Sequence, residues 1–145
     1  MPFRTAIRVV LLAPLFLAAA PVPDSLKELI TRAESARPED KPALYFAIAQ
    51  REFKAADQLY KDGKLEEARA AVRDVVSYSE KAHDAALQSG KKIKDTEIAL
   101  RKLAAKLRDL KRSLNFEDQE PVQTAADRLE SLRTDLLSHM FAKGK

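Results

Sequence analysis

Helix-breaking residues occupy only a few positions, and their placement is the strongest constraint on the fold. Six of the seven prolines lie at position 42 or earlier, and the exception is Pro121. The three glycines are Gly63, Gly90 and Gly144. Because both residue types end or destabilise helices, the long stretches without them permit helix. The chain beyond residue 42 is therefore predicted to be all-α, with divisions near residues 63, 90 and 115–121.

Composition agrees with an all-α domain of ordinary size. The chain has 145 residues, of which 33% are charged and only 6% aromatic, a balance typical of amphipathic helices. It contains no cysteine, which excludes disulfides, thiolate metal sites and thiol nucleophiles. Hydrophobic residues make up 46% of the chain, enough for a folded core.

The first twenty residues have the pattern of a secretory signal peptide. Arg4 and Arg8 precede an apolar run from Val9 to Ala20 that ends in small residues. This run is shorter than the roughly 20 residues that span a bilayer. Pro21 would directly follow the expected cleavage point, which is an unfavourable position for signal peptidase. Cleavage one or two residues earlier and retention of the segment as a membrane anchor therefore both stay open. We expect an exported chain, periplasmic or secreted.

Residues 21–42 are predicted to form a short helix and a linker. Ser25 and Glu28 have the spacing of a capping box, in which each side chain accepts from the other residue's backbone N–H. Asp40 is placed to cap the next helix, with Pro42 in its first turn.

Residues 43–141 are predicted to form a helical domain of two antiparallel hairpins, followed by a tail at 142–145. In the first hairpin, residues 43–89, apolar positions recur every three or four residues on both sides of Gly63. The second, residues 91–141, resembles a coiled coil because its apolar residues keep alternating steps of three and four. Its two seams are Ile93, Thr96, Leu100, Leu103, Leu107, Leu110 and Leu114, and Val122, Ala125, Leu129, Leu132 and Leu136.

Charge favours the pairing of the two helices in the second hairpin. Residues 91–115 hold nine basic and three acidic side chains, whereas residues 116–136 hold six acidic and two basic ones. Exposed ion pairs contribute only about 0.2–1 kcal/mol each, so leucine burial decides the association and charge selects the partner helix. A compact bundle and an elongated rod both satisfy the pattern, and the hairpins could also pair between two chains as a homodimer.

The segment from Glu52 to Val75 resembles a tetratricopeptide repeat. Ala56, Leu59 and Tyr60 precede Gly63, and Leu65, Ala68, Val72 and Val75 follow it at the spacing of that family. The segment departs from the family where Glu52 replaces a large aromatic residue and Ala56 replaces glycine, and no second copy follows. The resemblance implies a helical hairpin that binds other proteins.

Four residues could contribute to a metal site in a helical bundle. Glu80 and His83 have the i, i+3 spacing that di-iron bundles use, and Asp135 and His139 form a second carboxylate–imidazole pair. Such a site would also need inward carboxylates from other helices, for which Glu52 and Glu97 are the candidates. The alternative is that His83 is a half-buried packing residue.

Known catalytic and cofactor motifs are absent from the sequence. It has no P-loop, glycine-rich dinucleotide turn or nucleophile elbow, and we expect neither catalysis nor a cofactor. Removing residues 1–20 leaves a net charge of about +2, with no interleaved aromatics for base stacking, so nucleic acid is not an expected partner. The basic segment could instead form a surface for anionic partners: Lys91, Lys92, Lys94, Arg101, Lys102, Arg108 and Arg112.

Together these features predict an exported, non-enzymatic helical interaction or scaffold protein of the cell envelope. Its expected partner is another envelope protein. The alternative is a small ligand- or metal-handling bundle that uses Glu80 and His83.

Overall fold

The computed structural model describes residues 25–142, which form five α-helices, one short 3-10 helix and no strand. The helices are α1 (Leu26–Ser35), α2 (Lys41–Lys61), α3 (Leu65–Ser89), α4 (Ile93–Arg112), η1 (Phe116–Asp118) and α5 (Gln119–Ala142). The all-α prediction is confirmed for these residues. The predicted signal peptide and residues 143–145 lie outside them. Within residues 25–142 no helix is long and apolar enough to cross a bilayer.

The helix ends follow the local signals in the sequence, with one exception. The capping box is present, since the Ser25 hydroxyl accepts from the Glu28 N–H and the Glu28 carboxylate accepts from the Ser25 N–H. Gly63 and Gly90 adopt left-handed φ angles of 74° and 65° at the ends of α2 and α3. Asp40 occupies the N-cap position of α2, as predicted, but the expected capping hydrogen bond of its side chain is not formed.

The Asp40 carboxylate accepts a hydrogen bond from Arg37 Nε instead, at 2.9 Å. A guanidinium is a charged donor and competes well with backbone N–H groups. The backbone of Asp40 is also already near the helical region, whereas a capping residue is usually extended.

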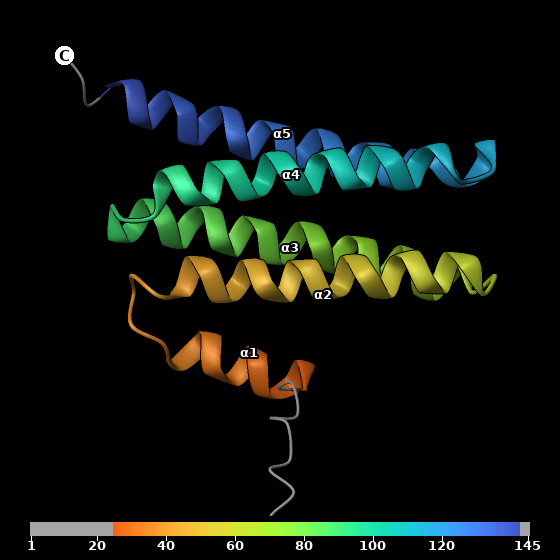
Figure 1. Ribbon diagram of the computed structural model, residues 1–145, viewed down its shortest axis with the longest axis horizontal. Coiled ribbons are helices and arrows are strands. Elements are labelled where there is room, and N and C mark those ends of the chain that lie inside the picture. Colours follow the sequence, from red (N-terminus) through yellow and green to blue (C-terminus); the bar gives the residue numbers. More distant parts are fainter. Residues whose placement is uncertain (1–24, 143–145) are drawn as a thin grey trace, which may run out of the picture.

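Two helical hairpins pack side by side into a bundle. α2 runs antiparallel to α3, and α4 runs antiparallel to α5 (Figure 1). Between the hairpins, α3 lies mainly against α5, and α2 lies beside α4 with fewer contacts. α1 packs on α2 at the edge of the bundle (Figure 1). The chain is thus a bundle and not a rod of hairpins placed end to end.

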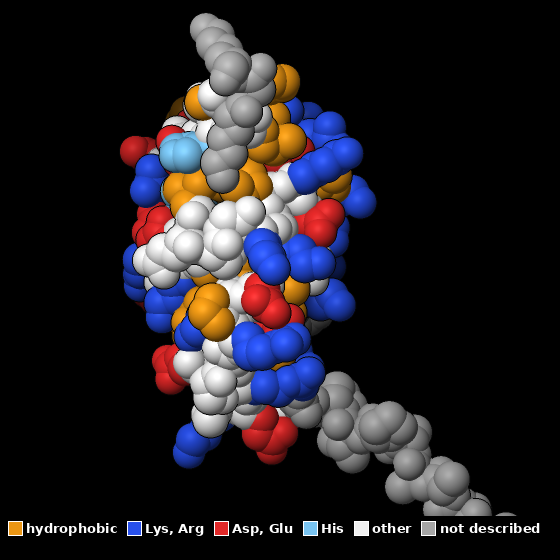
Figure 2. All heavy atoms as spheres, turned by 90° about the vertical axis from the view of Figure 1, so that its left-hand side faces the viewer, with side chains coloured by type: hydrophobic (Ala, Val, Ile, Leu, Met, Phe, Trp, Pro, Cys, Tyr) orange, Lys and Arg blue, Asp and Glu red, His pale blue; other side chains and the backbone are white. Residues whose placement is uncertain are grey.

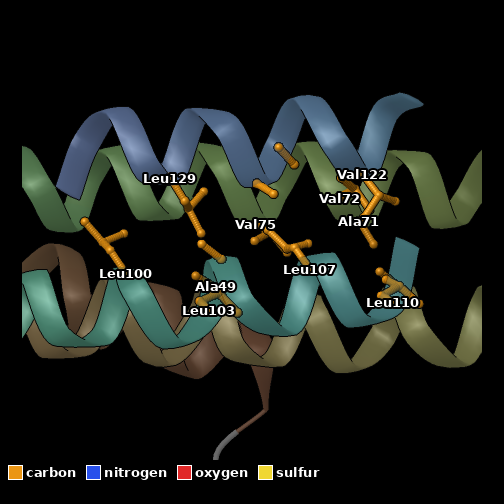
Figure 3. Packing of buried hydrophobic residues seen from close by; sticks show 14 of the residues in the cluster. Ala49, Ala71, Val72, Val75, Leu100, Leu103, Leu107, Leu110, Val122 and Leu129 are labelled. Carbon is orange, nitrogen blue, oxygen red and sulfur yellow. The ribbon is translucent and has the colours of Figure 1, made fainter. Parts of the chain in front are cut away.

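The leucine seam of α4 forms the centre of the core. Leu100, Leu103, Leu107 and Leu110 are buried, as predicted, and face residues of the other helices such as Val75 (Figure 3). Small residues of α2 and α3 let these two helices pack closely against each other. The buried alanines and valines there are Ala49, Ala56, Ala68, Ala71, Val72, Val75, Ala82, Ala85 and Ala86.

Ion pairs connect the helices of the second hairpin, in agreement with their opposite charges. Arg108 of α4 lies 3.0 Å from Glu130 of α5, and Arg133 of α5 lies 2.7 Å from Glu97 of α4. Glu97 is buried beside the seam, so the guanidinium of Arg133 supplies the partner that a buried carboxylate requires.

We predict that truncating the seam destabilises the whole bundle. Leu107 is fully buried, so Leu107→Ala should lower the free energy of unfolding by about 2–5 kcal/mol through lost burial and the resulting cavity. The control Leu65→Ala removes a side chain that is 38% exposed and should cost less than about 1 kcal/mol. Urea denaturation of both variants measures the difference, and equal losses would contradict the assignment of the core.

Candidate functional site

The structure brings three of the four predicted metal-site residues together between α3 and α5. His83 is buried, and its Nε2 lies 2.7 Å from Asp135 Oδ2 across the helix interface. Its Nδ1 lies 2.8 Å from Oδ1 of the adjacent Asp84. His139 Nδ1 lies 2.9 Å from the carbonyl oxygen of Asp135 and 3.8 Å from its Oδ1.

Glu80 does not join this cluster. Its carboxylate accepts a hydrogen bond from Arg128 Nε at 2.8 Å, which connects α3 to α5 at a second point. Both ring nitrogens of His83 lie within hydrogen-bond distance of carboxylate oxygens of this chain. Within the described part of the chain no three His, Asp or Glu side chains are placed to hold a metal ion. The contact between His83 and Asp135 joins α3 to α5.

The remaining two candidate metal ligands, Glu97 and Glu52, form no hydrogen bond or ion pair with either histidine in the described residues. Glu97 is paired with Arg133, as described above. Glu52 is buried in α2, and in residues 25–142 no hydrogen bond to its carboxylate is formed. Burial raises the pKa of Glu52, and the nearby negative charge of Asp74 raises it further.

The predicted basic surface divides into paired and unpaired residues. Arg108 pairs with Glu130, Arg112 with Asp109 and Lys92 with Asp95, at 3.0, 2.7 and 4.0 Å. In contrast, the other side chains of the set are exposed and have no acidic partner within residues 25–142. These are Lys91, Lys94, Arg101 and Lys102.

These basic residues also point to two different flanks of α4. Arg108 reaches Glu130 and so marks the flank toward α5. Arg101 lies seven residues earlier, two helical turns away, and shares that flank. Lys102 lies on the other flank, where it faces a groove between α4 and α2. The predicted surface is therefore not a single face.

A groove between α2 and α4 is bordered by basic residues of both helices. It consists of two adjoining parts of about 610 and 290 Å³ that share Gln50, Leu103 and Lys106. Its floor is mainly apolar, and lysines from both helices form its rim. The apolar lining residues are Phe46, Phe53, Ile98, Ala99, Leu103 and Leu110, and the rim lysines are Lys54, Lys61, Lys102 and Lys106.

Figure 2 shows one end of the bundle. Lys and Arg side chains gather on its right-hand side, with fewer Asp and Glu among them. That side faces the viewer in Figure 1, where α2 and α4 lie in front.

Sequence reasoning found only one side of this groove. The basic character of α4 was visible, but the contribution of α2 was not, because it depends on which helices become neighbours. The signal that could have revealed it is the pair Phe46 and Phe53, which lie two turns apart and are only partly buried in the core. Large aromatic side chains at the edge of an apolar stripe indicate a surface that continues outside the core.

Compared with known proteins, the chain matches no family model, no curated protein and no solved structure.

The raised pKa of Glu52 predicts a specific pH dependence of stability. A folded-state pKa above the unfolded value means that the native chain binds this proton more tightly. The stabilisation of the folded state by the protonated Glu52 carboxyl is fully present below the unfolded pKa, near 4.5. It is lost as the pH rises through the raised folded pKa. Glu52→Gln keeps a neutral side chain at every pH, so it should be more stable than the wild type at pH 7.

Urea denaturation at pH 4 and pH 7 measures this difference. The advantage of Glu52→Gln should largely disappear at pH 4, where the wild-type carboxyl is protonated in the native state. Glu117→Gln, at an exposed position, is the control and should change little at either pH. A Glu52→Gln variant that is less stable than the wild type at pH 7 would show that the carboxylate has a favourable partner.

Proposed function

We propose that this chain is an exported, non-enzymatic helical protein of the cell envelope that binds another protein. The observation that carries the proposal is the open apolar groove between α2 and α4, with its rim of lysines. A hollow with an apolar floor and charged edges, running along two helices, has the form of a binding surface for another helix. The charged residues between α3 and α5 are not part of this binding surface, because their acids and bases are paired with one another.

The first hairpin gives further support. Residues 52–75 comprise the C-terminal half of α2, the turn at Gly63 and the N-terminal part of α3. We interpret them as a single degenerate tetratricopeptide-like unit. That family binds proteins through the surfaces of its helical hairpins. The groove uses the outer side of α2, so the hairpin would contribute one wall of the binding surface and α4 the other.

Export follows from the N-terminal sequence, and a reporter fusion tests it. Residues 1–25 fused to alkaline phosphatase, which is active only after export, should give active enzyme in a bacterial host. Replacing Leu11 and Leu12 by Arg interrupts the apolar run and should abolish that activity. A fusion protein that carries the native segment but stays in the cytoplasm without activity would remove the envelope from the proposal.

Site-specific crosslinking tests the binding function. The photoreactive residue benzoylphenylalanine at Gln50, an exposed groove position, should capture a discrete envelope protein in intact cells. The same residue at Ser77, exposed on α3 and outside the groove lining, is the matched control and should give little or none of that adduct. Equal adducts at both positions, or no protein adduct at Gln50, would contradict a binding role for the groove.

A further inference from the structure

The groove between α2 and α4 has the length of a short helix. Its lining on α2 extends from Phe46 to Lys61, roughly 22 Å at 1.5 Å per residue. Four turns of an α-helix cover the same length. Along this distance no hydrogen bond or ion pair joins α2 to α4 within residues 25–142.

The apolar floor repeats at helical spacing. Phe46 and Phe53 lie seven residues apart on α2, and Leu103 and Leu110 lie seven apart on α4. These pairs mark successive positions two turns apart on each wall. Leu103 and Leu110 are almost fully buried and form the bottom of the groove. A third helix with apolar residues at heptad spacing would therefore contact mainly the partly buried side chains above them: Phe46, Phe53, Ile98 and Ala99.

The rim carries an excess of positive charge. Three aspartates also line the groove, but each is in an ion pair: Asp57 with Lys61, Asp109 with Arg112 and Asp95 with Lys92. Lys54, Lys102 and Lys106 are exposed and have no acidic partner in the described residues. They come from both walls, so a helix in the groove would meet lysines on both of its sides.

The hollow between α3 and α5 differs in this respect. It has a volume of about 470 Å³, and arginines also border it. However, Arg128 is paired with Glu80 and Arg69 with Asp118, so internal acids already neutralise these two cations. Unpaired cations from both walls distinguish the α2–α4 groove.

We propose that the groove binds an amphipathic α-helix of a partner protein whose apolar stripe is flanked by Asp and Glu. This inference rests on the proposed binding function and names the chemistry of the partner. Apolar contact with the floor supplies affinity, and the lysines select an acidic helix and reject a basic one.

Two other occupants fit the charge or the packing less well. The N-terminal segment of this chain carries Arg4 and Arg8 and no acid before Asp24, so its charge does not complement the rim. In a second copy the apolar stripes of α2 to α5 are already buried in its own bundle.

Binding of designed peptides to the purified chain, residues 21–145, tests the inference by fluorescence anisotropy. The acidic probe is a capped helical peptide with Leu at heptad core positions and Glu on both flanks, and the basic probe has Lys in place of each Glu. The acidic probe should bind at least about tenfold more tightly, and its affinity should fall as salt is raised.

Charge-reversal variants assign the preference to the rim. Lys102→Glu with Lys106→Glu should weaken binding of the acidic probe about tenfold and strengthen binding of the basic one. Lys94→Glu with Arg101→Glu makes the same change in net charge on the same helix, outside the groove lining, and should leave both affinities near those of the wild type.

Steric variants assign the binding to the floor. Ala99→Trp places a large side chain in the groove and should reduce binding of the acidic probe strongly, whereas Ala105→Trp, on the exposed face of α4, should not. Circular dichroism establishes that each variant is folded. If a variant does not fold, the comparison of the acidic and basic probes on the unmodified chain still tests the inference.

Four results would overturn the inference: equal binding of both probes, preference for the basic probe, displacement of the acidic probe by oleate at equal concentration, or self-association that Ala99→Trp abolishes. The last two would assign the groove to a lipid or to a second copy. If a protein is crosslinked at Gln50 but the acidic probe binds no more tightly than the basic one, the proposed binding function stands. Only the proposal that the partner is an acidic helix is then wrong.

Discussion

The bundle depends on the burial of the leucine seam of α4. Its four central leucines are covered on one side by α5 and on the other by the first hairpin, and they are almost fully excluded from solvent. Burial of each such side chain contributes about 1.5–3 kcal/mol, whereas an exposed ion pair contributes about 0–1 kcal/mol. The seam therefore holds the hairpins together, and the charged pairs add to the contacts of α5 with α4 and with α3.

Ion pairs are distributed unevenly around this core. α3 is connected to α5 through Glu80–Arg128 and His83–Asp135, and Arg69 of α3 reaches Asp118 of η1. No comparable pair joins α2 to α4 in residues 25–142. The same core thus has one flank fixed by polar contacts and another flank where apolar side chains and unpaired lysines face a groove. This asymmetry is the physical basis for placing the binding surface on the α2–α4 flank.

Local features of the fold could be predicted from the sequence, whereas contacts between distant segments could not. Ser25, Gly63 and Gly90 determine helix ends through their own backbone geometry, and the spacing of the leucines identifies the buried face of α4. By contrast, the spacing of Glu80 and His83 suggested a common site, yet Glu80 turns to Arg128 because α5 brings that guanidinium within reach. The choice between bundle and rod likewise depends on how two hairpins pack, and both arrangements bury the same stripes.

The separation of α2 and α4 is the feature on which the functional account depends. Because the chain has no cysteine, spin labels can be attached specifically to Ala55→Cys on α2 and Ala105→Cys on α4, both exposed positions. Pulsed electron–electron double resonance measures the distance between them. The account predicts one narrow distance distribution in the free chain, retained when the acidic peptide binds. A dominant shorter distance in the free chain, which would close the groove, would contradict it.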